Sequence, residues 1–143
     1  FKRQRGIVPM SSFIEWRNEK GSKQPWMITN EQQALAVAAL WDVWDREGSP
    51  LLSCTLVTTT AAPEFEPWHK RMPVVLAGDE AERWLDNSIA IESEDAIFRS
   101  ELKTRWRLQA VSRSMSNARN KNPSEMEGLG EVLELCPSSE TLP

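Results

Sequence analysis

The sequence predicts an α+β fold that is rich in strands. Apolar and β-branched runs of strand length recur along the chain, and turn sequences such as REGSP at 46–50 separate them. Only two segments, both in the second half, have the apolar spacing of a helix. The 143 residues are 40% hydrophobic and include seven tryptophans, so one domain of this length can bury a core.

The first strands are predicted to form a hairpin. FIEW at 13–16 and QPWMIT at 24–29 flank a polar turn, which is typical of two antiparallel strands. ALAVAALWDVW at 34–44 fits a helix or a strand by length, and the turn sequences on both sides favour a strand. LLSCTLVTTT at 51–60 is β-branched and predicts a strand, and MPVVL at 72–76 predicts a short one.

The later part of the chain contains the helical segments. Residues 77–88 predict a helix with Asp79 as its N-cap, because acidic residues fill the first turn. Residues 94–103 predict a second helix, with apolar residues along one side. Residues 104–112 alternate charged and apolar side chains, as a half-buried strand does.

Charge divides the chain into a domain at 1–123 and an acidic tail at 124–143. The net charge is −4, but the tail holds five glutamates and no lysine or arginine, which leaves 17 bases against 16 acids in the domain. The strongly basic composition that usually marks a nucleic-acid-binding domain is absent, and this balance does not exclude an anionic partner. We expect the tail to be irregular.

Cysteine and apolar content exclude several classes of protein. Cys54 lies in an apolar run and is predicted to be a buried thiol, whereas Cys136 lies in the polar tail. Two cysteines and one histidine cannot form a four-ligand zinc site of the usual kind, and we expect no metal and no cofactor. No apolar run approaches the roughly 20 residues of a membrane span, and the basic N-terminus lacks the apolar stretch of a secretory signal. We therefore expect a cytoplasmic protein.

Three features of the sequence are candidates for a chemical role. The pattern alone does not decide whether each has that role or an ordinary structural one. Glu15 lies among apolar neighbours that would raise its pKa and suit it to proton transfer, or it faces solvent on an alternating strand. His69, the only histidine, is a proton carrier or an ordinary packed or surface residue. A set of basic and aromatic residues could form a surface that binds single-stranded nucleic acid, or its tryptophans could fill the core while its arginines face solvent. The set comprises Trp16, Trp68, Arg71, Arg105, Trp106 and Arg107.

Several motifs, taken in order, resemble one known family. They are RGIVPMSSFIEW at 5–16, KQP at 23–25, AALW at 38–41, LVTTTAAPEFEPWHKRMPVVL at 56–76 and LQAVSRSMSN at 108–117. The chain is similar, over nearly all its length, to the SOS-response-associated peptidase (SRAP) family. That resemblance implies a strand-rich α+β fold whose mixed sheets form a partly open barrel with a few short helices.

The resemblance also implies a function and a site. Family members sense abasic sites in single-stranded DNA, and their N-terminal cysteine crosslinks to the ring-opened sugar as a thiazolidine. The family's glutamate matches Glu15, which would deprotonate the amine and move protons, and its histidine matches His69, which would assist opening of the sugar. The resemblance further implies DNA contacts by three residues: Trp16, Thr58 and Arg71.

The sequence departs from the family pattern at several positions. The family's Met-Cys-Gly-Arg start and an upstream Asn-Ala-Arg motif would precede residue 1, so we expect the nucleophilic cysteine to lie outside this chain. Cys54 and Cys136 cannot replace it, because neither offers a free α-amine. Ser11-Ser12 stands where Asp-Gly is usual, and Lys70 stands where an aspartate follows the histidine.

The resulting hypothesis is a monomeric abasic-site processing protein of the DNA damage (SOS) response. Its partner would be single-stranded DNA with abasic sites, in the cytoplasm or nucleoid of a bacterium, or with a phage origin. One alternative is a thiol autopeptidase that uses the same cysteine. Another is a non-catalytic module that binds single-stranded DNA.

Overall fold

Nine strands and one short α-helix form the described part of the chain, which in the computed structural model comprises residues 4–31, 34–117, 119–120 and 122–138. The strands are β1 (Arg5–Met10), β2 (Phe13–Glu19), β3 (Ser22–Asn30), β4 (Leu35–Arg46), β5 (Ser49–Leu56), β6 (Thr58–Thr60), β7 (Arg71–Pro73), β8 (Trp106–Ala110) and β9 (Leu129–Leu135). The helix is α1 (Glu80–Leu85), and three 3-10 turns are η1 (Ala96–Phe98), η2 (Arg113–Ser116) and η3 (Pro123–Met126). The strand-rich α+β prediction is confirmed.

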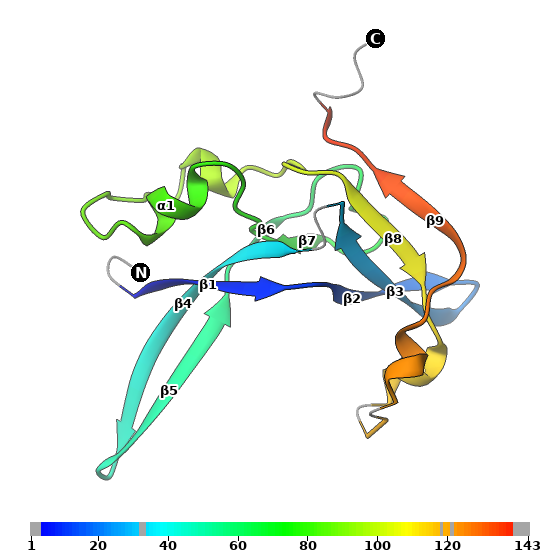
Figure 1. The fold of residues 1–143 in the computed structure, drawn as a ribbon, viewed down its shortest axis with the longest axis horizontal. Coiled ribbons are helices and arrows are strands. Elements are labelled where there is room, and N and C mark those ends of the chain that lie inside the picture. Colours follow the sequence, from blue (N-terminus) through cyan, green and yellow to red (C-terminus); the bar gives the residue numbers. More distant parts are fainter. Residues whose placement is uncertain (1–3, 32–33, 118, 121, 139–143) are drawn as a thin grey trace.

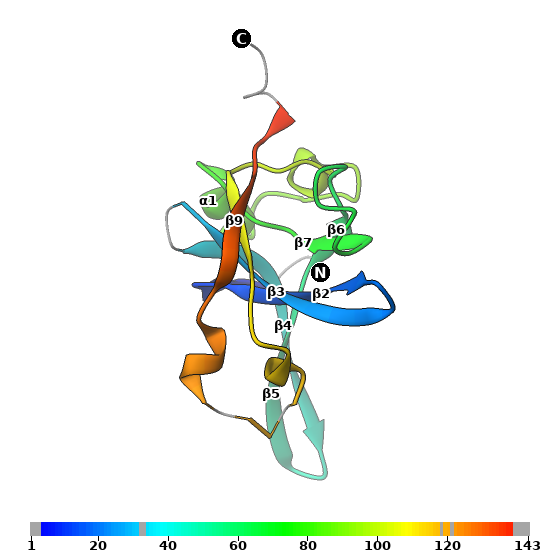
Figure 2. The ribbon, with the colours of Figure 1, turned by 90° about the vertical axis from the view of Figure 1, so that its right-hand side faces the viewer.

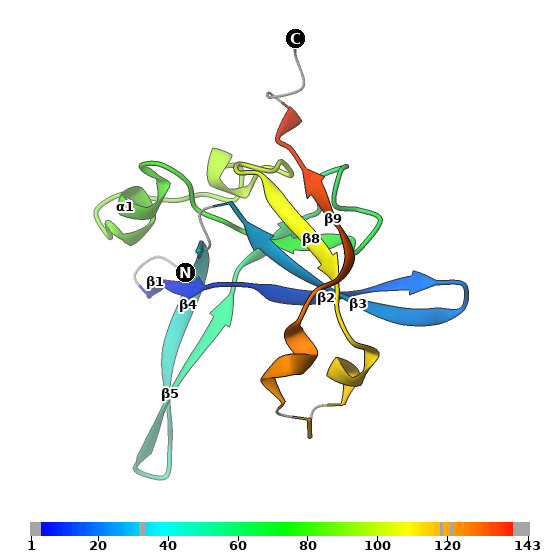
Figure 3. The same ribbon diagram turned by 45° about the vertical axis from the view of Figure 1, so that its right-hand side comes forward.

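The strands form three open sheets (Figure 1). Their orders are β1-β4-β5, β2-β3-β8-β9 and β6-β7. Every pairing among the described strands is antiparallel, which corrects the expectation of mixed sheets, and over these residues the sheets do not close into a barrel. The predicted hairpin is confirmed as β2 and β3, and its turn extends away from the other sheets in Figure 3.

Strand β4 lies between two core clusters. The side chains of Leu35 and Val37 pack into an aromatic cluster that contains Phe65 and Trp106, whereas Ala38 packs on the opposite face with Trp84. The alternation follows from the two-residue period of a strand. Because both faces are covered, ALAVAAL reads as a continuous apolar run rather than an alternating one.

The aromatic cluster joins β2 and β8 to the loop that precedes β7. The ring of Phe65 lies 5.1 Å from that of Trp106 and 6.2 Å from that of Phe13, in edge-to-face geometry with both. Rings at such separations and angles attract one another beyond the burial of their area. Phe13 therefore anchors β2 against the loop at 61–70.

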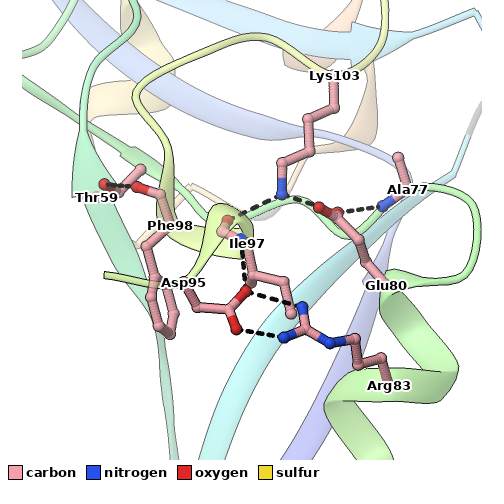
Figure 4. A network of polar contacts seen from close by, with 8 residues as sticks. All are labelled: Thr59, Ala77, Glu80, Arg83, Asp95, Ile97, Phe98 and Lys103. Carbon is pink, nitrogen blue, oxygen red and sulfur yellow. Dashed lines mark hydrogen bonds and ion pairs between the residues drawn. The ribbon is translucent and has the colours of Figure 1, made fainter. Parts of the chain in front are cut away.

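A polar network replaces the second predicted helix (Figure 4). Asp95 accepts a hydrogen bond from Ile97 N–H (3.0 Å) and pairs with both terminal nitrogens of Arg83 on α1. Lys103 Nζ donates to Glu80 Oε2 at 2.8 Å and to the Ile97 carbonyl at 2.9 Å. These bonds hold the segment as the single turn η1, so the predicted helix at 94–103 is wrong, and α1 is shorter than the predicted 77–88.

The predicted strand at 51–60 is divided at Val57. The N–H of Val57 donates to the Ala38 carbonyl at 2.8 Å, and its own carbonyl accepts from Val74 N–H at 2.9 Å. The chain thus passes from β5 into β6 and leaves one sheet for another. The short strand predicted at 72–76 is β7, followed by a single bridge between Val75 and Val37.

The acidic tail is not irregular over its whole length, which corrects the prediction. Residues Leu129–Leu135 form β9, which pairs with β8, as Figure 2 shows. Leu133 and Leu135 pack against the aromatic cluster, so their burial stabilises the strand despite its acidic neighbours.

The distal halves of β4 and β5 project from the rest of the molecule as a two-stranded arm (Figure 1). Cys54 lies on this arm and is exposed, so the prediction of a buried thiol is wrong. The reason is that no described element covers the arm, although its sequence has the composition of a buried strand. Its exposed apolar residues are Trp41, Val43, Trp44, Leu51, Leu52 and Leu56.

No helix among the described residues is long and apolar enough to cross a membrane.

We predict that Phe65→Ala lowers the free energy of unfolding by about 3–5 kcal/mol, because it removes a fully buried ring and leaves a cavity. Urea unfolding followed by tryptophan fluorescence measures the change. The control is Leu52→Ala on the arm, where a 69% exposed side chain predicts a change within about 0.5 kcal/mol. Equal destabilisation by both variants would contradict the assignment of Phe65 to the core.

Candidate active site

An open cleft of about 390 Å³ brings together side chains from four separate parts of the chain. β2, β3, the loop before β7 and η2 each contribute to it. Three of the predicted site residues lie in it, namely Glu15, Trp16 and His69. Lys23 and Ser116 complete its lining.

The cleft lies along an edge strand. β2 has β3 on one side and, among the described strands, no partner on the other. Glu15 is on the same face of β2 as Phe13, which points to the aromatic cluster, whereas Trp16 is on the opposite face. Side chains from both faces of β2 therefore line the cleft at the open edge of this strand.

Burial and a nearby base act in opposite directions on Glu15. Partial burial raises the pKa of its carboxyl, while the proximity of His69 and a hydrogen bond from Trp16 N–H lower that pKa to a smaller extent. A raised pKa brings a carboxyl closer to the pH at which it can both give and take a proton during a reaction. The prediction that apolar surroundings raise the pKa of Glu15 is confirmed.

The imidazole of His69 is oriented by the backbone of Arg71. His69 Nδ1 lies 2.8 Å from the Arg71 carbonyl oxygen and 3.1 Å from the Arg71 amide nitrogen. Either tautomer therefore finds a partner, so the ring keeps its orientation when its proton moves. Nε2 makes no hydrogen bond within the described residues and is left for a reactant. The buried residues Trp68 and Met72 anchor the chain on both sides of the ring.

Thr58 and Arg71 lie next to the cleft and contact each other. Arg71 Nε donates to Thr58 Oγ1 at 2.9 Å, and Arg71 Nη2 donates to the Thr58 carbonyl at 2.6 Å. The two residues belong to the paired strands β6 and β7 and are exposed, and neither lines the cleft. The remaining nitrogen, Nη1, has no partner within the described residues and can donate to an anion.

Lys23 and Ser116 were not predicted as site residues. Trp16 Nε1 donates to Ser116 Oγ at 2.9 Å, which fixes the orientation of the indole that lines the cleft. Both residues lie within the motifs that carry the family resemblance, but nothing in those motifs gave them a role. The hairpin register was the available signal, because Lys23 pairs with Asn18 and so shares a face with Trp16.

The basic and aromatic set predicted from composition does not form one surface. Trp68 and Trp106 are 9% and 2% exposed and belong to the core, whereas Trp16 is 38% exposed. Arg17 lies over the Trp68 ring, 4.9 Å from its centroid. Among the described residues, no group of three or more histidine, cysteine, aspartate or glutamate side chains is arranged to hold a metal ion.

Comparison with known proteins assigns the family. The family model described as SOS response associated peptidase (SRAP) matches residues 1–118. The chain belongs to the SRAP family. It is 30% identical over 150 residues to the abasic site processing protein HMCES of Xenopus tropicalis, covering 90% of this chain and 44% of that protein. It is 38% identical over 86 residues to the abasic site processing protein YoaM of Bacillus subtilis, covering 58% and 38%.

Two solved structures share the fold of this chain. A protein from Bacteroides thetaiotaomicron superposes with a TM-score of 0.72 at 20% identity, covering 90% of this chain and 58% of that one. A protein from Bordetella bronchiseptica superposes with a TM-score of 0.58 at 26% identity, covering 76% and 55%. The chain thus spans less than half the length of HMCES or YoaM, and little more than half of either structural relative.

The structure places the residues that depart from the SRAP pattern, Lys70 and Ser11-Ser12, relative to the cleft. Lys70 is exposed, and the His69 ring is held by the Arg71 backbone, so its orientation does not depend on a carboxylate at position 70. Ser11 and Ser12, in place of Asp-Gly, form the connection between β1 and β2. Neither change displaces Glu15 or His69 from the cleft.

We predict that Glu15→Gln increases stability at pH 7 more than at pH 4. Because burial raises the pKa of Glu15, the folded state holds this proton more tightly than the unfolded state. Ionisation therefore destabilises the fold as pH rises above the ordinary glutamate value of about 4.3. The amide cannot ionise and avoids that cost. Urea unfolding of wild type and variant at both pH values measures the difference.

Glu66→Gln is the control, since this exposed substitution reports the general effect of removing one negative charge. A Glu15→Gln difference that is the same at pH 4 and pH 7 would show that the carboxyl is not held in its protonated form.

Proposed function

We propose that this chain is the part of an abasic-site processing protein that supplies proton transfer and DNA contacts. The cleft that joins Glu15 and His69 at the open edge of β2 is the observation that supports this role. Curated relatives are named abasic site processing proteins. The proposed substrate is an abasic site in single-stranded DNA, bound by one copy of the protein in the cytoplasm or nucleoid.

The proposed reaction joins an N-terminal cysteine of the SRAP type to the ring-opened sugar. Its α-amine attacks the C1′ aldehyde, and water leaves to give an imine. The thiolate then adds to the imine carbon while the nitrogen takes up a proton, which closes a five-membered thiazolidine ring. Amine, thiol and aldehyde thus combine with the loss of one water, and the acid and base are returned unchanged.

Glu15 and His69 divide the proton transfers in this proposal. The Glu15 carboxylate takes a proton from the α-ammonium, and the carboxylic acid returns it to the leaving oxygen; its raised pKa suits both steps. His69, with Nδ1 held by Arg71, uses Nε2 on the sugar oxygen to open the ring. Each group lines the same cleft, as a shared substrate requires.

The DNA contacts follow from the exposed groups around the cleft. Trp16 offers an indole face on which a neighbouring base can stack. Arg71, held by Thr58, offers its free Nη1 to a phosphate. Open strands present unpaired bases and a flexible backbone, which both contacts require, so single-stranded DNA is the proposed form.

We predict that Glu15→Gln and His69→Ala each slow crosslink formation by roughly 10²–10⁴-fold, the usual contribution of a general acid or base. The test uses a polypeptide in which a SRAP amino-terminal segment beginning Met-Cys precedes this chain. A denaturing-gel time course follows its covalent attachment to a single-stranded oligonucleotide containing one abasic site. The matched control is Glu66→Gln, an exposed carboxylate outside the cleft.

Rates equal to wild type for both variants would overturn the proposed roles. Binding to the oligonucleotide without any covalent product would instead support a non-catalytic single-strand-binding module. Cleavage of a peptide by the same polypeptide, abolished by the same substitutions, would support the peptidase alternative.

A further inference from the structure

A second open cleft, of about 470 Å³, lies on the sheet formed by β2, β3, β8 and β9. Most of its lining side chains are polar. Its residues are Ser11, Ser12, Met27, Thr29, Asn30, Arg107 and Met126. Nothing in the proposed reaction uses this cleft.

Strand register places the second cleft on the same sheet face as Trp16. Trp16 pairs with Pro25, and Thr29 pairs with Arg107, so the odd-numbered residues of β3 and Arg107 share the face of the indole. Lys23 lines the first cleft and Thr29 lines the second. Thr29 lies six positions after Lys23 along the strand, which corresponds to about 20 Å. One side of β3 therefore connects the two clefts.

The second cleft offers hydrogen-bond donors and one guanidinium. The side chain of Arg107 is 52% exposed, and its Nε lies 3.2 Å from Glu134 Oε1 on β9. The hydroxyls of Ser11 and Ser12 make no hydrogen bond within the described residues, so both can donate to a ligand.

The pairing with Glu134 shows that an oxyanion can reach Arg107. Glu134 Oε2 also lies 3.7 Å from Arg105 Nη1, so the carboxylate keeps one cationic partner when another anion takes its place at Arg107. A phosphodiester has the same oxygen geometry toward a guanidinium as a carboxylate and accepts the same bonds. Met27 and Met126 also line the cleft and offer apolar contacts to neutral sugar and base atoms.

We propose that this second cleft binds a phosphodiester of the DNA strand that flanks the abasic nucleotide, with Arg107 and the hydroxyls of Ser11 and Ser12 as donors. Glu134 occupies Arg107 until the strand arrives and is displaced by it. This inference rests on the proposed function and extends it, because it gives the strand a path along β3 away from the first cleft. It also makes β9 a competitor for part of the DNA surface.

The test compares two single-stranded oligonucleotides that contain a stable tetrahydrofuran abasic analogue, one just long enough for the first cleft and one extended on both sides. Fluorescence anisotropy measures their affinity for this chain across a range of salt concentrations. We predict that Arg107→Ala weakens binding of the long oligonucleotide roughly five- to tenfold and reduces the salt dependence by about one phosphate contact. Binding of the short oligonucleotide should not change.

Two further variants test whether the effect of Arg107→Ala arises from the second cleft. Glu134→Gln should strengthen binding of the long oligonucleotide, because it removes the competing carboxylate without removing Arg107. Arg99→Ala removes the same charge from an exposed loop position outside both clefts and should leave the difference between the oligonucleotides intact.

Equal weakening by Arg99→Ala and Arg107→Ala, or loss of affinity for both lengths in Arg107→Ala, would overturn the second site and leave the first cleft unaffected. Failure of wild-type protein to bind either oligonucleotide would overturn the proposed function as well.

Discussion

The burial of the first part of β4, residues 35–39, on both faces and along both edges is the constraint on which the fold depends. Leu35 and Val37 fill one core cluster, and Ala38 fills the other. β1 pairs with one edge of the strand, while Ala38 N–H donates to the Val74 carbonyl and Leu76 N–H to the Ala36 carbonyl along the other. Ala38 is fully buried among the side chains of the second cluster, so a larger side chain there would overpack the core.

The same constraint positions the candidate site. The strand on one edge of β4 continues through Ser11 and Ser12 into β2, which carries Glu15. The segment on the other edge is preceded by β7 and, just before it, by His69. Glu15 and His69, to which we assign the proposed proton transfers, therefore come from the two chain segments that flank one buried strand. Past the first residue of β4, contact between the Phe13 and Phe65 rings joins these two segments.

Sequence patterns correctly predicted the elements that are determined by neighbouring residues. They failed where contacts with distant segments determine the local structure. The β2–β3 hairpin and β4 follow from turn residues and apolar runs, but the segment around Asp95 lost its helix to contacts with Arg83 and Lys103 that no spacing reveals. In the site, Glu15 and His69 were predicted from the family motifs. Ser116 was not, since it enters the cleft through one bond to Trp16, a hundred residues away in sequence.

The projecting arm exposes a strand edge, with apolar side chains beside it, to other molecules in solution. Beyond Leu40 the same strand that organises the core leaves it, and its tryptophans stand beside an open strand edge in water. Such an edge is a template for adding a strand from another molecule, and natural sheets oppose this with charge. Asp42, which follows Trp41, and Asp45, which follows Trp44, provide that charge on β4. The two carboxylates are therefore gatekeepers that oppose the addition of a strand from another molecule to the arm.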